Sequence, residues 1–236
     1  MDGVIGMEEA RAIVGNAALW PRVRDFLWDF AGQVHESWLE GIAGAETSDA
    51  EHVDVSSLVS RLATVPRVKR FILAQLEVAP CFHAFPKDDG SRLLLLDGAT
   101  LEGVARWLGA IACAEELRRI TDGATIRALK AALPGVYPDV FGYVAYFSKN
   151  DFERRDAEAL GIEEIQTCGI GVLLSAVANL PASLYLRFRM KLPKQLCGLC
   201  DSASLRLKER PTPTALSAVL KLLKLKFPEA YSLCCS

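Results

Sequence analysis

Residues 101–120 read LEGVARWLGAIACAEELRRI, and this stretch decides the expected fold. Apolar side chains recur in it at intervals of three and four residues, which places them on one face of an α-helix. Asp97 and Thr100 stand just before it and offer side-chain oxygens that can cap the first turn. We therefore predict a central helix that begins near Thr100 and buries Leu101, Val104, Leu108, Ile111 and Leu117.

Helical periodicity continues on both sides of this stretch. It covers residues 56–78 upstream and residues 124–133 downstream, where Asp122 can cap the first turn. Residues 138–147 predict a further helix, and an amphipathic helix follows Thr214 near the end of the chain. The fold class that we predict is therefore mainly α, a compact helical domain.

One stretch near residue 190 departs from the helical pattern. Residues 184–192, LYLRFRMKL, alternate strictly in polarity, which is typical of a β-strand. Residues 205–208, LRLK, alternate in the same way and can supply the partner strand. We predict a small β-hairpin at about 184–208; the alternative is a helix, because Leu and Arg are both good helix formers.

The N-terminal part of the chain predicts a separate arm. Residues 20–39 have apolar residues at helical spacing and indicate one amphipathic helix, and the small and polar residues 41–54 indicate a loop. We therefore predict an acidic N-terminal helical arm and loop over 1–54, and a main helical domain over 55–236 with a basic C-terminal third. The first 15 residues lack the basic and apolar parts of a secretory signal, so we expect a cytoplasmic protein.

An uncharged stretch, residues 165–186, is close to the length of about 20 residues that a membrane-spanning helix needs. Gln166, Asn179 and Pro181 interrupt it. Polar interruptions at membrane depth need partners that a single segment cannot supply. We therefore predict a buried core helix over 162–180 and no membrane span.

Charge is divided between the two ends of the chain. Residues 2–54 hold eleven acids and three bases, whereas residues 184–227 hold ten bases and two acids, in a chain whose formal net charge is -2. A division of this kind favours docking to other macromolecules. The candidate partner-binding residues are Arg187, Arg189, Lys191, Lys221 and Lys224.

The basic end has alternative interpretations. It can be an ordinary solvated surface, or it can bind nucleic acid or an anionic membrane, the latter through the lysines of residues 221–226. The chain contains few interleaved aromatic residues and no nucleic-acid recognition motif, so we do not expect a nucleic-acid partner.

Chemistry-bearing motifs are few. Cys197 and Cys200 have the spacing of a zinc-binding or redox-active pair, but the sequence supplies no second pair at a suitable spacing and no histidine nearby. The three histidines, His35, His52 and His83, are not placed beside a nucleophile in any recognisable pattern. We expect no enzyme, no catalytic residue and no cofactor; a zinc-binding or thiol redox protein is the alternative.

Four segments together resemble one family. The stretch 101–120, TIRALKAAL (125–133), LYLRFRMKLP (184–193) and LSAVLKLLKLKFPEAY (216–231) resemble the SctK/YscK proteins of bacterial type III secretion. We place the similarity at about residues 93–231. The first ninety residues and the CGLC segment stand apart from the family pattern.

The resemblance implies a mainly helical accessory protein of the sorting platform in the bacterial cytoplasm, peripheral to the inner membrane. Members of this family join the cytosolic domain of the inner-membrane ring to the pods built from the C-ring protein of the injectisome, and they carry no catalytic residues. Our hypothesis is a non-enzymatic adaptor whose two charged ends meet these two partners.

Overall fold

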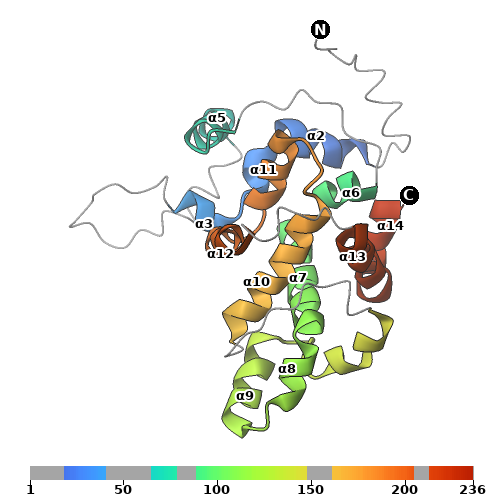
Figure 1. Ribbon diagram of the computed structural model, residues 1–236. Helices are drawn as coiled ribbons and strands as arrows, with labels where there is room; N and C mark the ends of the chain where they lie inside the picture. The colour runs from blue at the N-terminus through green and yellow to red at the C-terminus, as the bar shows by residue number, and fades with distance from the viewer. Residues whose placement is uncertain (1–18, 41–64, 79–88, 148–160, 205–212, 236) are drawn as a thin grey trace, which may run out of the picture. The chain divides into compact units, whose positions relative to one another are not determined.

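The structure is a computed structural model, and all of its regular elements within the described residues are helices (Figure 1). This finding confirms the mainly α fold class. The described residues are 19–40, 65–78, 89–147, 161–204 and 213–235. Contacts divide the chain into two compact units. Unit 1 is built from residues 1–98, 180–195 and 233–236, and unit 2 from residues 99–179 and 196–232.

Unit 1 collects short helices from distant parts of the sequence. They are α2 (Trp20–Trp28), η1 (Phe30–Gln33), α3 (Glu36–Leu39), α5 (Pro66–Gln75), α6 (Asp89–Arg92), η2 (Leu93–Leu95) and α11 (Ala182–Met190).

The single helix predicted over residues 20–39 is wrong, because three short helices occupy this stretch. Asp29 leaves the helical region with φ -121° and ψ 35°, and α2 ends there. His35 is extended, and its Nδ1 accepts a hydrogen bond from the backbone N–H of Ser37 at 3.2 Å, which starts α3. Apolar spacing alone did not reveal these two breaks.

The predicted β-hairpin is also wrong. Residues 182–190 form α11 and residues 194–204 form α12, while the expected second strand at 205–208 lies outside the described residues. The buried side chains of this stretch include Leu184, Arg187, Phe188 and Lys191, which recur at helical intervals. The sequence alternates in polarity because Arg187 and Lys191, which are basic, lie on the buried side of this stretch.

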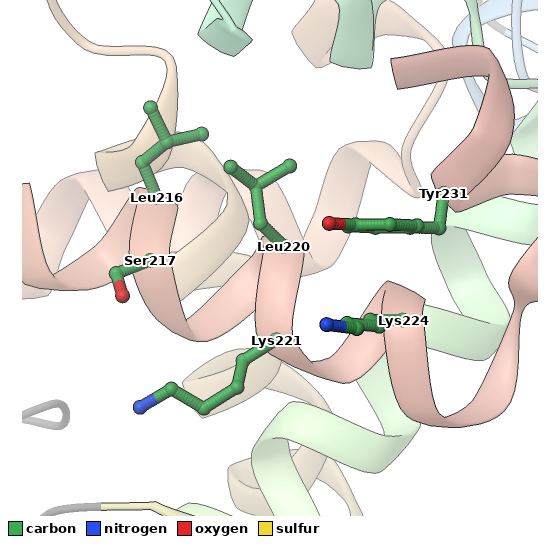
Figure 2. A pocket seen from close by; sticks show the side chains of 6 residues that line it. All are labelled: Leu216, Ser217, Leu220, Lys221, Lys224 and Tyr231. Carbon is green, nitrogen blue, oxygen red and sulfur yellow. The ribbon is translucent and has the colours of Figure 1, made fainter. Parts of the chain in front are cut away.

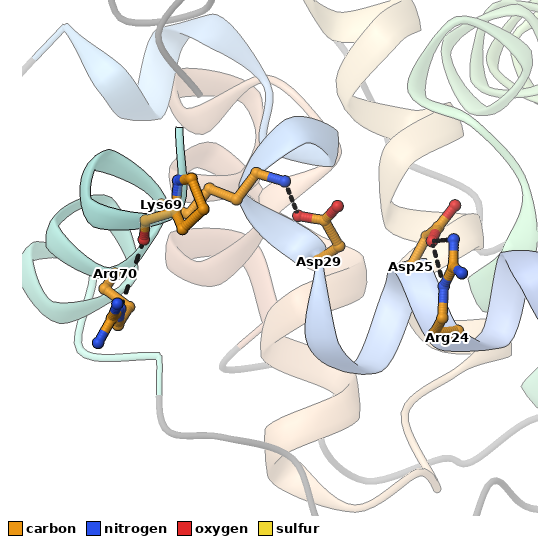
Figure 3. A network of polar contacts seen from close by, with 6 residues as sticks. Arg24, Asp25, Asp29, Lys69 and Arg70 are labelled. Atoms are coloured by element: carbon orange, nitrogen blue, oxygen red, sulfur yellow. Dashed lines mark hydrogen bonds and ion pairs between the residues drawn. The ribbon is translucent and has the colours of Figure 1, made fainter. Parts of the chain in front are cut away.

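Apolar contacts and one ion pair join α5 to the N-terminal helices of unit 1. Ala31, Leu39 and Ile72 are buried together. The Nζ of Lys69 forms an ion pair with Asp29, as Figure 3 shows. Since such ion pairs near the surface contribute little to stability, the apolar cluster is the main contact between α5 and the other helices.

Unit 2 contains the longer helices. They are α7 (Gly98–Ala112), α8 (Ala114–Arg119), α9 (Gly123–Ala132), η3 (Asp139–Gly142), η4 (Val144–Tyr146), α10 (Ile162–Ala176), α12 (Lys194–Ser204), α13 (Pro213–Lys226) and α14 (Pro228–Cys235), with the first residues of α7 and α12 and the last of α14 assigned to unit 1.

The helix predicted near Thr100 is α7, and all five of its predicted core residues are buried. Cys113 interrupts the regular helix, so that Leu117 belongs to the short α8. Asp122 caps α9 as predicted: it accepts hydrogen bonds from the backbone N–H and the hydroxyl of Thr125 at 2.7 and 2.8 Å. These hydrogen bonds hold the pKa of the Asp122 carboxyl below its usual range.

Two other predictions for unit 2 were correct only in part. Residues 139–146 form two 3-10 turns instead of an α-helix. The core helix expected over 162–180 is α10, which ends at Ala176.

Among the helices within the described ranges, none has the length and apolar character needed to cross a membrane. The boundary expected between residues 54 and 55 lies in 41–64, outside the described residues, and stays a prediction.

The backbones of α7 and α10 touch where they cross. A Cβ atom added at Gly109 would collide with the carbonyl of Ile165, and one added at Gly169 would collide with the carbonyl of Ala105. Since neither carbonyl belongs to a movable side chain, only glycine fits at these two positions. Helix α13 packs against α10 as well.

We expect Gly109→Ala to lower the free energy of unfolding by about 1–3 kcal/mol, because the helices must move apart to admit the methyl group. Urea unfolding followed by circular dichroism measures the effect.

Gly198→Ala is the matched control, since a Cβ at this exposed position in α12 meets nothing within 4 Å. We expect it to raise stability by about 0.5–1 kcal/mol, because alanine is the better helix former. Equal effects of the two substitutions would contradict the close crossing.

Candidate functional site

The five candidate partner-binding residues lie in different surroundings. Arg187 belongs to α11 and is only 1% exposed. Its Nη1 donates a hydrogen bond to the carbonyl oxygen of Phe26 at 2.9 Å, and its guanidinium carbon lies 5.2 Å from the centre of the Phe30 ring. Arg187 therefore binds α2 and η1 from inside unit 1, and its charge is not available to a partner in this structure.

Lys191 follows α11 and is also 1% exposed. Its Nζ donates hydrogen bonds to the carbonyl oxygens of Leu94 and Leu96 at 2.7 and 3.0 Å, and lies 4.8 Å from the centre of the Phe26 ring. Burial lowers the pKa of Lys191 to about 7; Asp97 opposes this shift and Arg22 adds to it. A neutral amine has two N–H groups, which match the two carbonyl oxygens.

Arg189 points to another part of unit 1 and is half-buried. Its guanidinium carbon lies 5.9 Å from the centre of the Trp38 ring, and Lys194 Nζ lies 5.6 Å from the same ring. The indole N–H of Trp38 donates to the carbonyl oxygen of Leu192 at 2.9 Å. Two cations thus contact the Trp38 ring, which helps to fix α3 against the end of α11.

Lys221 and Lys224 lie on α13 in unit 2 and reach the surface. Lys224 is exposed, and Lys221 is half-buried with its Nζ 5.6 Å from the centre of the Phe147 ring. Lys226, further along the same helix, lies 4.2 Å from the Trp107 ring centre and 4.1 Å from that of Tyr143. Aromatic rings therefore hold two of the three lysines of α13.

A hollow of about 360 Å³ lies on α13 and α14 beside these lysines, and Figure 2 shows the side chains that surround it. Its apolar lining comes from two leucines of α13 and the ring of a tyrosine of α14. The six lining residues are Leu216, Ser217, Leu220, Lys221, Lys224 and Tyr231.

Sequence reasoning selected only the two lysines of this hollow. It placed Leu216 and Leu220 on the apolar face of the amphipathic helix that follows Thr214. In the structure both are half-buried, while Ala218, Val219 and Leu222 are buried. The contribution of Tyr231 to the hollow was not predicted, because it depends on the direction that α14 takes after Phe227.

The cysteine pair lies on the buried side of α12, with Cys197 fully buried and Cys200 2% exposed. The thiol of Cys200 donates to the carbonyl oxygen of Thr167 at 3.4 Å. In the parts of the chain that the structure describes, no three His, Cys, Asp or Glu side chains are grouped so that they could hold a metal ion. Both thiols pack between α12 and its neighbours in unit 2.

Comparison with known families gives one match. The model described as YOP proteins translocation protein K (YscK) covers residues 47–234, most of the chain. The chain belongs to the YscK family. It is therefore a type III secretion protein, as the resemblance implied. The match begins well upstream of residue 93, where we placed the start of the similarity, and it includes the CGLC segment.

Membership of the YscK family implies two further points. The family is a structural or accessory family of the secretion system and is not a known enzyme family, and its partners are proteins of the secretion apparatus. No match was found among curated proteins or among solved structures.

We expect the stability of this YscK protein to rise with pH between about 7, the pKa of folded Lys191, and its ordinary value of 10.5. In this window the unfolded chain binds more protons than the folded chain, so the cost of burying the ammonium group disappears as pH rises. Below pH 7 both states are protonated, and the cost is present in full. Urea unfolding at pH 7, 8 and 9 measures the slope.

Lys191→Met removes the titrating group, so we expect its stability to vary less with pH over the same range. Lys194→Met is the matched control, because Lys194 is exposed, and it should keep the wild-type slope. Identical slopes for wild type and Lys191→Met would contradict a buried amine of low pKa.

Proposed function

We propose that this protein is a non-enzymatic adaptor of the type III secretion sorting platform. It links the cytosolic domain of the inner-membrane ring to the C-ring protein of the pods. Membership of the YscK family supports this role, since the partners of that family are proteins of the secretion apparatus. On this proposal the protein works in the bacterial cytoplasm, peripheral to the inner membrane.

The surface of α13 and α14 is the part of the basic end that best suits docking. Lys224 is exposed and Lys221 lies beside it at the rim of the hollow. Positive charge at the edge of an apolar surface speeds encounter with an acidic partner and sets its orientation. The position of Lys224 and the half-buried Lys221 at the surface, in contrast to the burial of Arg187 and Lys191, is the observation that carries the assignment.

Arg187, Arg189 and Lys191 serve this adaptor in a different way. They hold the N-terminal helices of unit 1 against α11, through Phe26, Phe30 and Trp38. A carboxylate in place of Arg187 or Lys191 would face backbone carbonyl oxygens in the interior, so such a variant reports on folding instead of docking.

Charge reversal at Lys221 and Lys224 tests the proposal. We expect the double variant Lys221→Glu/Lys224→Glu to lose affinity for the C-ring protein or for the cytosolic domain of the ring by tenfold or more, on the order of 1.4 kcal/mol. Pull-down with each purified partner measures binding, and export of secreted substrates measures function.

Arg127→Glu/Lys130→Glu is the matched control: both residues are exposed on α9 of the same unit, and the charge change is identical. It should bind and secrete as the wild type does. If the Lys221 and Lys224 variant keeps its circular dichroism spectrum, both partners and secretion, this surface is not the adaptor's docking site.

A further inference from the structure

We propose that the hollow on α13 and α14 receives an amphipathic helix of a partner protein, one that carries acidic side chains beside an apolar row. The inference rests on the proposed function and names the kind of segment that the adaptor binds. The hollow and its rim are formed by Leu216, Ser217, Leu220, Lys221, Lys224 and Tyr231.

The lining residues form two parallel rows along α13. Leu216 and Leu220 are four residues apart and form the apolar row, which the Tyr231 ring extends from α14 (Figure 2). Ser217, Lys221 and Lys224 form the polar row beside it, at intervals of four and three residues. From the rise of 1.5 Å per residue, the polar row follows the helix axis for about 10 Å and the two leucines for about 6 Å.

The spacing of the rows selects a helix as occupant. An amphipathic helix places its own apolar and charged residues in adjacent rows at the same intervals of three and four residues. Two turns of such a helix match the length of the hollow. A small ligand would need convergent polar groups in an enclosed cavity, whereas the polar groups here lie along one side of an open surface.

The charge of the lining residues favours an acidic helix as the occupant. None of the six lining residues is acidic, and two are lysines. Carboxylates in the partner's polar row would meet Lys221 and Lys224, while a basic helix would bring like charges together at a cost.

Aromatic contacts keep this surface in one arrangement. Lys221 lies over the Phe147 ring, and Lys226 lies between the rings of Trp107 and Tyr143. Phe227, where α13 ends, packs against Gly103 of α7, with ring atoms 3.3 and 3.4 Å from the position of a Cβ there. A surface that is ordered before binding loses less entropy when a partner helix docks.

Site-directed crosslinking identifies the occupant directly. A photo-crosslinking amino acid replaces Ser217, which is exposed at the hollow, in the full chain within secreting cells. After irradiation, mass spectrometry of the crosslinked peptide is expected to find a helical segment of the ring protein or the C-ring protein with acidic and apolar residues at helical spacing. The same amino acid at Ala128, exposed on α9, is the control and should not label that segment.

An apolar substitution separates this inference from the proposed function. We expect Leu216→Gln to weaken partner binding about tenfold, because it removes an apolar anchor while both lysines remain. Leu225→Gln is the control, since Leu225 is 37% exposed on the same helix and does not line the hollow. The affinity of this variant for the partner should equal that of the wild type.

Three outcomes would overturn the inference: a crosslink at Ser217 to lipid or to a segment without acidic residues, no crosslink to either partner, or full affinity of Leu216→Gln. If the lysine reversals abolish binding while Leu216→Gln leaves it intact, the adaptor function stands and the amphipathic helix does not. If the lysine reversals also leave binding intact, this surface is not the docking site; if the wild-type chain itself binds neither partner, the proposed function fails as well.

Discussion

The arrangement of unit 1 depends on two basic side chains that are buried against aromatic rings and backbone carbonyl oxygens. Arg187 and Lys191 lie four residues apart, so both point to the same side of the chain, toward the rings of Phe26 and Phe30. Backbone carbonyl oxygens from α2 and from the 89–97 region accept their hydrogen bonds. Since a polar or charged group is costly to bury without such partners, both regions must stay in place for α11 to occupy this position. The two side chains therefore join three stretches that are far apart in the sequence.

This burial changes the meaning of the charge division. The ten basic residues between 184 and 227 resemble one long positive surface when they are read in order, but they belong to separate environments. Arg187 and Lys191 are interior, Arg189 and Lys194 flank Trp38, and three more lie outside the described residues. Helix α13 presents lysines beside an apolar hollow. Net charge along a sequence is thus a guide to docking only after the buried cations are set aside.

The sequence predicted the fold class and the long helices well, because α7, α9, α10 and α13 have the apolar spacing and end signals that local physics requires. The capping carboxyl of Asp122 is one such signal. Prediction from the sequence failed where a tertiary contact decides the local structure. The residues of α11 alternate in polarity because the helix buries Arg187 and Lys191, and binary patterning assumes that cations face water. The hollow was missed for a related reason: half-buried leucines have the same spacing as core leucines, and only the turn into α14 distinguishes them.

The same physics separates the buried cysteine pair from the α13 lysines that we propose for docking. Cys197 and Cys200 are buried, and the carbonyl of Thr167 accepts a hydrogen bond from Cys200. Lys224 of α13 is exposed, while aromatic rings position Lys221 and Lys226. A docking protein needs fixed charge next to apolar area that water can leave, and α13 with α14 supplies both within two turns of helix. Helix α13 is in turn packed against α10, which crosses α7 closely at Gly109 and Gly169, so the proposed docking surface is built on packed helices of unit 2.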